Sequence, residues 1–333
     1  MLAAVTGAAG HLGANVVQAL VEQGDAVRAV DVRPGTVIRG LTGEGHPVEF
    51  VRADVLDPAT LPAAFAGVEV VYHLAARISI AGDPDGAVWR VNVDGVRHVA
   101  EAARTAGVRR LVHTSSIHAF DGRLSPEGVD ERSPRSTNPD LPVYDRSKFA
   151  GEEVLRQLID RGLDAVVVNP TAIIGPVDPE PSRMGRVLRS AFRGRLPAVV
   201  DGSFDWVDVR DLAAAVLAAA RRGRVGENYL VGGHYASVGE LARVAASAAG
   251  RRGPRFTVPT PLARVAAAAA LRLPSGRSGP LFTPEALHAL HTGRPVVSDK
   301  ARDELGHAPR PLAETMADLR AYFETGGSAG RTP

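Results

Sequence analysis

Residues 2–13 read LAAVTGAAGHLG: an apolar run leads into a glycine-rich turn, and a helical pattern begins at Asn15. We interpret this stretch as strand, tight turn and helix, the arrangement that binds a dinucleotide pyrophosphate at a helix N-terminus. Gly7 supplies the tight turn, Gly10 lets a ligand approach the backbone, and Gly13 lets the helix pack closely on the strand. A glycine triplet alone is a weak signal, and an ordinary glycine-rich turn is the alternative.

The next strand-like run supports the dinucleotide interpretation. Residues 26–30 end at Asp31, about 20 residues after the glycine turn, where a ribose-binding carboxylate is expected. A carboxylate there accepts hydrogen bonds from the ribose hydroxyls of NAD and repels the 2′-phosphate of NADP. Arg33 offers that phosphate a cation, so NADP stays the alternative and NAD is the favoured cofactor.

The composition argues against several other classes of protein. Among 333 residues, 39 are basic and 37 are acidic, which leaves a formal charge of +2 and no sign of a nucleic-acid site. The absence of cysteine excludes disulfides, thiolate catalysis and cysteine-ligated metals, and no metal site is predicted. A strand that starts at Leu2 leaves no room for a cleavable signal, and no apolar run is long enough for a membrane span. We expect a cytoplasmic protein that binds a small molecule and neither nucleic acid nor membrane.

Strands and helices alternate through the first half of the chain. Apolar, β-branched runs are followed in turn by helical patterns: 48–52 then 58–66, 68–74 then 87–105, 110–114 then 146–160, and finally 165–168. The alternation predicts an α/β fold with a doubly wound parallel Rossmann sheet, which binds ligands beyond the carboxyl ends of its strands. A loop rich in Pro, Ser and Asp at 120–142 resembles an active-site flap.

After Gly175 the alternation ends. Helical patterns dominate from here, with two short strands, in the order helix 183–193, helix 209–220, strand 227–231, helix 237–249, strand 255–258, helix 261–272 and helix 311–324. We expect a Rossmann domain with the catalytic residues at 1–175, a smaller α/β substrate lobe at 176–325, and a flexible tail at 326–333. The chain could cross back to the first domain near 205–231.

Tyr144 and Lys148 lie four residues apart and therefore share a face of the expected helix. The chain has 5 tyrosines and only 2 lysines, so this spacing would arise by chance about 3% of the time. Lowering a phenol pKa from about 10 to about 7 requires roughly 4 kcal/mol, which one cation about 4 Å away can supply. A tyrosine tuned in this way acts as general acid to a ketone or as general base to an alcohol.

Ser116 follows the strand expected at 110–114, where its hydroxyl could hold a substrate oxygen near Tyr144. A serine at such a strand end is otherwise an ordinary turn or helix cap. His113 and His118 lie nearby and raise the alternative of a serine hydrolase, but the chain lacks the Gly-x-Ser-x-Gly elbow of that class. His113 is expected to be a strand residue whose ring has its hydrogen-bond partners, whereas His118 is a candidate to face the substrate.

Several motifs occur in a fixed order along the chain. They are TGAAGHLG at 6–13, Asp54-Val55, HLAA at 73–76, TSS at 114–116 and Tyr144-x-x-x-Lys148. Together they resemble the extended short-chain dehydrogenase/reductases, also called the NAD-dependent epimerase/dehydratase family. The resemblance implies that Ser116, Tyr144 and Lys148 form a catalytic triad, supported by Asn92. It also implies a homodimer through a helix bundle that includes the Tyr144 helix.

The resemblance further implies which residues bind the cofactor. The glycine turn flanks the pyrophosphate, Asp54 and Val55 face the adenine, and Ala75 and Ala76 line the nicotinamide half. The full set is Gly7, Ala9, Gly10, His11, Leu12, Asp31, Arg33, Asp54, Val55, Leu74, Ala75, Ala76, Tyr144, Lys148, Pro170 and Ile173.

Two positions indicate the branch of the family. Sugar-nucleotide epimerases carry an Asn three residues before the glycine matched by Gly175 and an Arg directly before the Asp matched by Asp205. Here these positions hold Ala172 and Phe204. The chain resembles instead the dihydroflavonol-reductase-like branch, whose relatives include the 3β-hydroxysteroid dehydrogenases and which transfers hydride between cofactor and a ketone or secondary alcohol.

We therefore expect an oxidoreductase with Tyr144 as general acid and base and a mainly apolar pocket for an uncharged small molecule. The candidate substrate contacts are His118, Ala172, Arg183, Phe204 and Trp206. A nucleotide-sugar epimerase or dehydratase of the same family is one alternative. A catalytically silent protein that senses the dinucleotide is another, but a sensor needs only the glycine turn and this chain keeps the whole triad.

Overall fold

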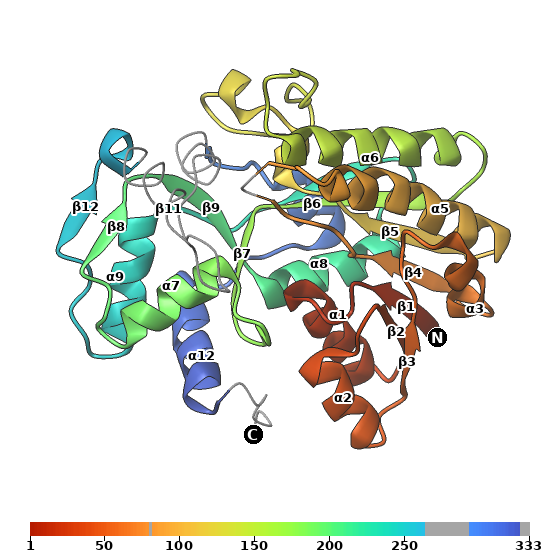
Figure 1. The fold of residues 1–333 in the computed structure, drawn as a ribbon, viewed down its shortest axis with the longest axis horizontal. Coiled ribbons are helices and arrows are strands. Elements are labelled where there is room, and N and C mark those ends of the chain that lie inside the picture. The colour runs from red at the N-terminus through yellow and green to blue at the C-terminus, as the bar shows by residue number, and fades with distance from the viewer. Residues whose placement is uncertain (80–81, 264–292, 327–333) are drawn as a thin grey trace.

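A computed structural model describes residues 1–79, 82–263 and 293–326 of the chain (Figure 1). Most of the expected helix at 261–272 and nearly all of the expected tail at 326–333 lie outside the described residues. The described ranges form a larger part built on one parallel sheet and a smaller lobe beside it. None of the helices in these ranges combines the length and the apolar character that crossing a membrane requires.

The central sheet has seven parallel strands, and their order confirms the predicted doubly wound α/β fold. Across the sheet the strands are β10 (Asn228–Val231), β6 (Ala165–Pro170), β5 (Arg110–Thr114), β4 (Val70–His73), β1 (Leu2–Thr6), β2 (Ala26–Asp31) and β3 (Val48–Arg52). Chain order runs outward from β1 to β3 on one side and from β4 to β10 on the other. Sheets of this kind bind ligands where the order reverses, here beyond the carboxyl ends of β1 and β4.

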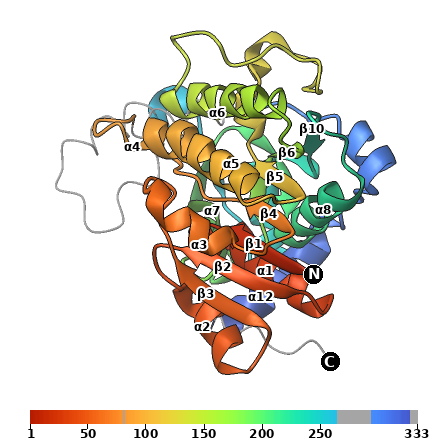
Figure 2. The ribbon, with the colours of Figure 1, turned by 90° about the vertical axis from the view of Figure 1, so that its right-hand side faces the viewer.

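Helices cover both faces of this sheet (Figure 2). One face packs against α1 (His11–Glu22), α2 (Gly35–Gly43) and α8 (Val209–Arg222), and the other against α3 (Leu61–Phe65), α5 (Gly95–Thr105) and α6 (Val143–Ile159). Successive side chains of a strand point to opposite faces. In β6, Val166 and Val168 enter the core under α8, whereas Ala165 and Val167 enter the core under α6. Strands buried on both faces carry continuous apolar runs, which is why the sequence pattern is so clear here.

The chain leaves the central sheet after β6 and later returns to it. α8 lies against one face of the sheet, and β10 pairs in parallel with β6. Residues 209–231 therefore belong to the larger part of the molecule, within the range 205–231 where the sequence allowed a crossing.

The smaller lobe has its own core. In the described ranges it consists of β7 (Ala172–Ile174), β9 (Ser203–Asp208) and β11 (His234–Ser237) in one sheet, β8 (Ala198–Val200) and β12 (Phe256–Val258) in another, and the helices α7 (Arg183–Phe192), α9 (Val238–Ala248) and α12 (Leu312–Glu324). An ion network attaches it to α8. Arg210 donates to both carboxylate oxygens of Asp208, at 3.0 and 2.8 Å, and to Asp318 of α12 at 2.6 Å.

The structure differs from the predicted elements in several places. A π-helical turn, η2 (Arg90–Asp94), separates α4 (Ala87–Trp89) from α5 in what the sequence predicts as one helix. α6 begins at Val143 rather than Arg146 and so includes Tyr144. The sequence does not predict α2, because its three glycines weaken a helical pattern, nor the strands of the sheet β11-β9-β7. The remaining short helical turns are η1 (Pro58–Thr60), η3 (Ile117–Ala119), η4 (Gly122–Leu124) and η5 (Ala301–Leu305).

Candidate active site

The glycine turn forms a cradle made of backbone. Gly7 has a φ of +71°, and a Cβ on it would lie 2.7 Å from the Ala75 nitrogen. A Cβ on Gly13 would overlap the Gly7 carbonyl, so α1 packs against the turn as closely as the sequence predicts. Gly10 caps α1, and its N–H donates to the Gly7 carbonyl at 3.0 Å. Glycine alone leaves the backbone open at these positions, which fits the approach of a pyrophosphate to the helix N-terminus.

Asp31 lies at the end of β2 beside this turn. Its carboxylate accepts the Ala9 N–H at 3.0 Å and the Val32 N–H at 2.8 Å, which fixes its orientation. Arg33 forms an exposed ion pair, 2.9 Å long, with Glu180 of the smaller lobe. The pair contributes little to stability. It does place the Glu180 carboxylate beside Arg33, the residue that could otherwise bind the 2′-phosphate of NADP. The residues present therefore fit NAD better than NADP.

A groove of about 520 Å³ lies across the carboxyl edge of the central sheet. It brings together the predicted residues Gly7, Ala9, Gly10, His11, Asp31, Arg33, Asp54, Val55, Leu74, Ala75 and Ala76. Leu12 is instead buried in the core, and Tyr144, Lys148, Pro170 and Ile173 do not line the groove. The smaller lobe adds Asp178, Pro179, Glu180 and Ser182, which sequence reasoning missed because no local motif marks them.

Two side chains of α1 hold the smaller lobe against this groove. The His11 ring donates from Nε2 to the Pro176 carbonyl at 3.2 Å, and the Asn15 amide donates to the Val177 carbonyl at 3.3 Å. Both residues lie in the first turns after the glycine cradle. The loop after β7 is thereby attached to the same helix that presents its N-terminus to the groove.

Lys148 is nearly fully buried on α6, with 3% of its surface exposed. Its Nζ donates to the Thr114 carbonyl at 3.1 Å, at the end of β5. Burial lowers the pKa of Lys148 to about 8, while the charge of Glu152 raises it. The ammonium is still mostly protonated at neutral pH, and its remaining donors are available at the carboxyl edge of the sheet.

Tyr144 differs from the sequence expectation. Burial raises the pKa of Tyr144 to about 12, although a hydrogen bond from the Ser116 hydroxyl lowers it and the Asp145 charge raises it. The sequence predicts that Lys148 lowers the pKa of Tyr144 toward about 7. For the protein without bound cofactor this prediction is wrong. A low dielectric disfavours the phenolate more than the neighbouring groups stabilise it, and the Lys148 ammonium is directed to the Thr114 carbonyl.

Ser116 stands where β5 ends, as the sequence predicts. Its backbone is extended, and its Oγ accepts the His118 N–H at 3.2 Å as the cap of η3. Its carbonyl accepts the Asn169 amide at 2.9 Å. Hydrogen bonds to the hydroxyl and to the carbonyl of Ser116 therefore fix the residue whose hydroxyl meets Tyr144.

Asn92 fixes the helix that carries Tyr144 and Lys148. It lies in the π-helical turn η2, and its Nδ2 donates to the Ser147 hydroxyl on α6 at 3.0 Å. Its amide also exchanges two hydrogen bonds with the Arg77 backbone, at 2.9 and 3.0 Å. A Cβ on Gly151 would overlap the Asn92 carbonyl, so α6 packs tightly on this turn. Isolated π-helical turns are frequent at functional sites.

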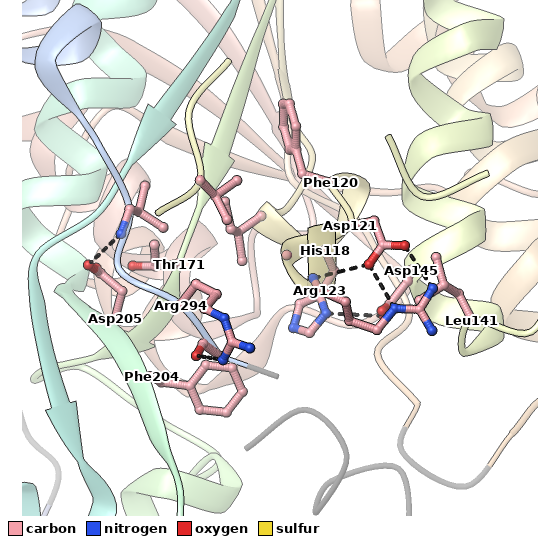
Figure 3. A pocket seen from close by; sticks show the side chains of 15 residues that line it. His118, Phe120, Asp121, Arg123, Leu141, Asp145, Thr171, Phe204, Asp205 and Arg294 are labelled. Carbon is pink, nitrogen blue, oxygen red and sulfur yellow. Dashed lines mark hydrogen bonds and ion pairs between the residues drawn. The ribbon is translucent and has the colours of Figure 1, made fainter. Parts of the chain in front are cut away.

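A second pocket lies next to Tyr144, and it has two walls (Figure 3). His118, Asp121, Arg123, Leu141 and Asp145 stand on one side, and Thr171, Phe204, Asp205 and Arg294 on the other. The remaining lining residues are Ile117, Phe120, Gly122, Val129, Gly293 and Val296. The His118 ring packs edge-on against Tyr144, with ring centroids 5.5 Å apart, which connects this pocket to the Tyr144 side chain.

Of the predicted substrate contacts, the structure brings His118 and Phe204 into this pocket. Trp206 lies instead in the core of the smaller lobe, 3% exposed, with its Nε1 donating to the Ala236 carbonyl at 2.9 Å. Ala172 and Arg183 line neither the pocket nor the groove. Phe204 and Trp206 are two positions apart on β9 and therefore share a face of the strand, with ring centroids 5.5 Å apart. Trp206 fills the core of the smaller lobe, and Phe204 lies beside it at the pocket.

The pocket is more polar than the sequence predicts. Its lining includes seven polar or charged residues: His118, Asp121, Arg123, Asp145, Thr171, Asp205 and Arg294. The expectation of a mainly apolar pocket did not include these charges. It rested on positions 172 and 204, whereas most of the charges come from the flap and from segments remote in sequence.

Most of these charges are paired with one another. Arg123 donates to both oxygens of Asp121, at 2.8 and 2.7 Å. The His118 Nδ1 lies 3.1 Å from Asp145; burial opposes the imidazolium, but the Asp145 carboxylate outweighs it and raises the pKa of His118. Within the described ranges, Arg294 pairs with no carboxylate and donates to the adjacent Gly293 carbonyl at 3.1 Å.

Comparison with known proteins identifies the family. A model of the NAD dependent epimerase/dehydratase family matches residues 3–232. Sterol demethylase protein B of Methylococcus capsulatus is 37% identical over 98% of this chain and 99% of its own length. UDP-glucose 4-epimerase of Mycolicibacterium smegmatis is 35% identical over 96% of this chain and 97% of its own. A putative dihydroflavonol 4-reductase of Synechocystis is 30% identical over 97% of this chain and 94% of its own.

These matches agree with the geometry of the groove and with the resemblance inferred from the motifs. The glycine cradle and the oriented carboxylate of Asp31 are the features that a dinucleotide requires. The chain therefore belongs to the NAD-dependent epimerase/dehydratase family, the extended short-chain dehydrogenase/reductases, an enzyme family whose cofactor is NAD.

Proposed function

We propose that the protein is an NAD-dependent oxidoreductase that transfers hydride between the nicotinamide and a ketone or secondary alcohol. The main support is the environment of Tyr144. Its phenol meets the Ser116 hydroxyl, its ring packs against His118 of the pocket wall, and Lys148 follows one helical turn later. A proton donor at the edge of a pocket, next to a second hydroxyl, suits proton transfer to a carbonyl oxygen.

Bound NAD supplies the hydride donor or acceptor. Tyr144 Oη donates a proton to the substrate oxygen when a ketone is reduced and takes it back when the alcohol is oxidised. Ser116 Oγ holds that oxygen beside the phenol. Lys148 Nζ bonds the Thr114 carbonyl and does not offset the burial of Tyr144, so its proposed part is to bind the cofactor. Since burial raises the pKa of Tyr144 to about 12, the phenol carries its proton at neutral pH and can act as the acid.

The pocket supports a substrate with an apolar body and a polar group. Ile117, Phe120, Leu141, Phe204 and Val296 supply apolar surface, while the charged residues of the lining are largely paired with one another. Two of the relatives are named as a sterol demethylase protein and a dihydroflavonol reductase. We propose a steroid-like or aromatic ketone or secondary alcohol as the substrate class.

One observation favours a second candidate, a nucleotide-sugar epimerase. Arg294 points into the pocket and carries a charge that no carboxylate of the described ranges neutralises (Figure 3). A guanidinium in that state suits a diphosphate. The relative named as a UDP-glucose 4-epimerase is also 35% identical to this chain.

A single assay separates the two candidates. Purified protein is mixed with NADH and a panel of 3-ketosteroids, dihydroflavonols and simple aromatic ketones, and loss of the nicotinamide absorbance is followed. In parallel, protein with NAD is mixed with UDP-glucose, and formation of UDP-galactose is measured. We expect ketone-dependent oxidation of NADH. Interconversion of the UDP-sugars without any reduction of ketones would establish the epimerase instead.

We also propose a homodimer that forms through α5 and α6. The two helices lie side by side on one face of the larger part, as the views in Figures 1 and 2 agree. Sedimentation velocity with the purified protein measures the mass directly. A species of 34.9 kDa, the mass of one chain, at micromolar concentration would contradict the proposal.

A further inference from the structure

Glu152 is a fully buried carboxylate that takes no direct part in the proposed reaction, although its charge raises the pKa of Lys148. It lies on α6 one turn after Lys148, and none of its side chain is exposed. Its Oε1 accepts the Asn169 amide at 2.7 Å, and its Oε2 accepts the Asn228 amide at 2.9 Å and the Arg135 guanidinium. A buried carboxylate is costly unless several donors satisfy it. Here three donors from three separate segments converge on one side chain.

Arg135 connects this carboxylate to the flap. Its guanidinium lies 3.9 Å from the ring centroid of Phe120 and 5.2 Å from that of Phe149. Two aromatic faces and one carboxylate therefore hold the same planar group. Arginine suits this arrangement because it stacks on rings and donates in a fixed direction at the same time.

The flap base, residues 118–121 and 134–136, carries the pocket wall. Its two segments are joined by a β-bridge at Phe120 and by the Ser136 hydroxyl, which donates to the His118 carbonyl at 2.8 Å. His118 and Phe120 both line the pocket. A shift of the arginine at position 135 would therefore move the wall that faces the substrate.

The same carboxylate reaches the catalytic serine through one amide. Asn169 donates from Nδ2 both to Glu152 and, at 2.9 Å, to the Ser116 carbonyl. Its Oδ1 accepts the Asn228 amide at 2.8 Å, which fixes the direction of the group. Because every polar atom of this amide has a partner, it cannot rotate without losing hydrogen bonds.

We propose that Glu152 is a positioning residue that fixes the flap base through Arg135 and Ser116 through Asn169. The expected effect on kcat rests on the proposed function. The expected effect on the flap base and on the Ser116 segment does not depend on it. A carboxylate with a merely structural role would stabilise the whole protein evenly. A positioning carboxylate acts on the flap base, on the Ser116 segment and on kcat.

Glu152→Gln tests this role with almost no change of size. The amide nitrogen must face either Asn169 on one side or Asn228 and Arg135 on the other, so a donor meets a donor in both orientations. Glu152→Asp keeps the charge and offers a conservative rescue. Arg135→Met removes the flap contact alone, and it serves as the second variant if Glu152→Gln does not fold, because the Arg135 side chain is 21% exposed.

Glu49→Gln is the matched control. The Glu49 carboxylate also pairs with an arginine, Arg28, at 3.0 Å, but it is 65% exposed and lies on β3, on the opposite side of the sheet from β6 and β10. Losing an exposed pair of this kind should change neither the flap nor turnover.

The experiment combines hydrogen–deuterium exchange with kinetics on the full chain. In Glu152→Gln and Arg135→Met, we expect peptides from the flap base to exchange about tenfold faster, while peptides from β1, β2 and β3 stay unchanged. The kcat for the ketone found in the NADH assay should fall about tenfold, and the Kd for NAD should change less than about threefold. Glu152→Asp should recover part of kcat, and Glu49→Gln should match the wild type.

The proposal is overturned if exchange at the flap base and kcat both stay within about twofold of the wild type in these variants. It is also overturned if exchange rises evenly across the central strands, since that result marks a structural role only. A wild type that reduces no ketone and converts no UDP-sugar would contradict the proposed function instead. Exchange at the flap base and at the Ser116 peptide would then still test Glu152.

Discussion

The cofactor groove and the substrate pocket are built from different material. The groove is formed largely by backbone: glycines at 7, 10 and 13 leave it open, and the Asp31 carboxylate beside them is oriented by two backbone N–H groups. The pocket is side chain: paired charges such as Asp121 with Arg123 line it between aromatic rings. Backbone recognition suits the part of the ligand that all relatives share. Side-chain recognition can change one residue at a time, so we propose that specificity for the substrate belongs to the pocket.

Tyr144→Phe should have the largest effect, and it should affect turnover at the pocket without affecting NAD binding in the groove. The phenol proton matters to the chemistry of the pocket side and little to a dinucleotide held by backbone. We expect kcat to fall about a hundredfold or more, with the Kd for NAD nearly unchanged. Steady-state kinetics and titration calorimetry measure the two quantities. If the variant keeps more than about a tenth of the wild-type kcat, a loss of less than about 1.4 kcal/mol, Tyr144 is not the acid and base.

Gly7→Ala should break the groove and leave the pocket intact. The new Cβ would stand 2.7 Å from the Ala75 nitrogen at a φ of +71°, so the backbone cradle must distort. We expect NAD affinity to fall roughly tenfold to a hundredfold, about 1–3 kcal/mol. Gly40→Ala, inside α2 with no atom within 4 Å of the new Cβ, is the control and should bind NAD normally. Equal affinities for the two variants would show that the turn does not hold the cofactor.

The same contrast explains which parts the sequence predicts. The groove depends on short-range features, the spacing of glycines in one turn and a carboxylate at the next strand end. The sequence therefore indicates the lining residues Gly7, Ala9, Gly10, His11 and Asp31. The alternating apolar runs predict the central sheet for a similar reason, since each strand is buried on both faces. The pocket instead joins the flap to Thr171, Asp205 and Arg294, which are brought together only by the tertiary fold. No local pattern records such pairs, and Trp206 shows the result: an aromatic residue at a plausible site that fills the core.

Asp31 tests how far side chains contribute to the groove. Asp31→Ala removes the carboxylate that repels a 2′-phosphate, and we expect the preference for NAD over NADP to narrow by about tenfold, roughly 1.4 kcal/mol. Adding Glu180→Gln releases Arg33 from its 2.9 Å ion pair and should narrow it further. Titration calorimetry with both cofactors measures the ratio. Equal affinities in the wild type would remove the basis for assigning this role to Asp31.

The smallest effect should come from the charge pair within the pocket. The Asp145 carboxylate raises the pKa of His118 above its ordinary value despite burial. A group whose pKa is raised on folding stabilises the protein fully below its unfolded pKa, about 6.5, and this contribution is lost as the pH rises through the folded pKa. His118→Phe keeps a ring against Tyr144 and Phe204 but removes the titration. The variant should therefore be less stable than the wild type by on the order of 1 kcal/mol near pH 6, the size of one charged hydrogen bond, and the difference should shrink toward pH 9. Thermal unfolding at both pH values measures it. A difference that stays constant with pH would mean that the ring packs in the pocket wall without carrying a charge, and the pocket would then recognise its substrate without an imidazolium.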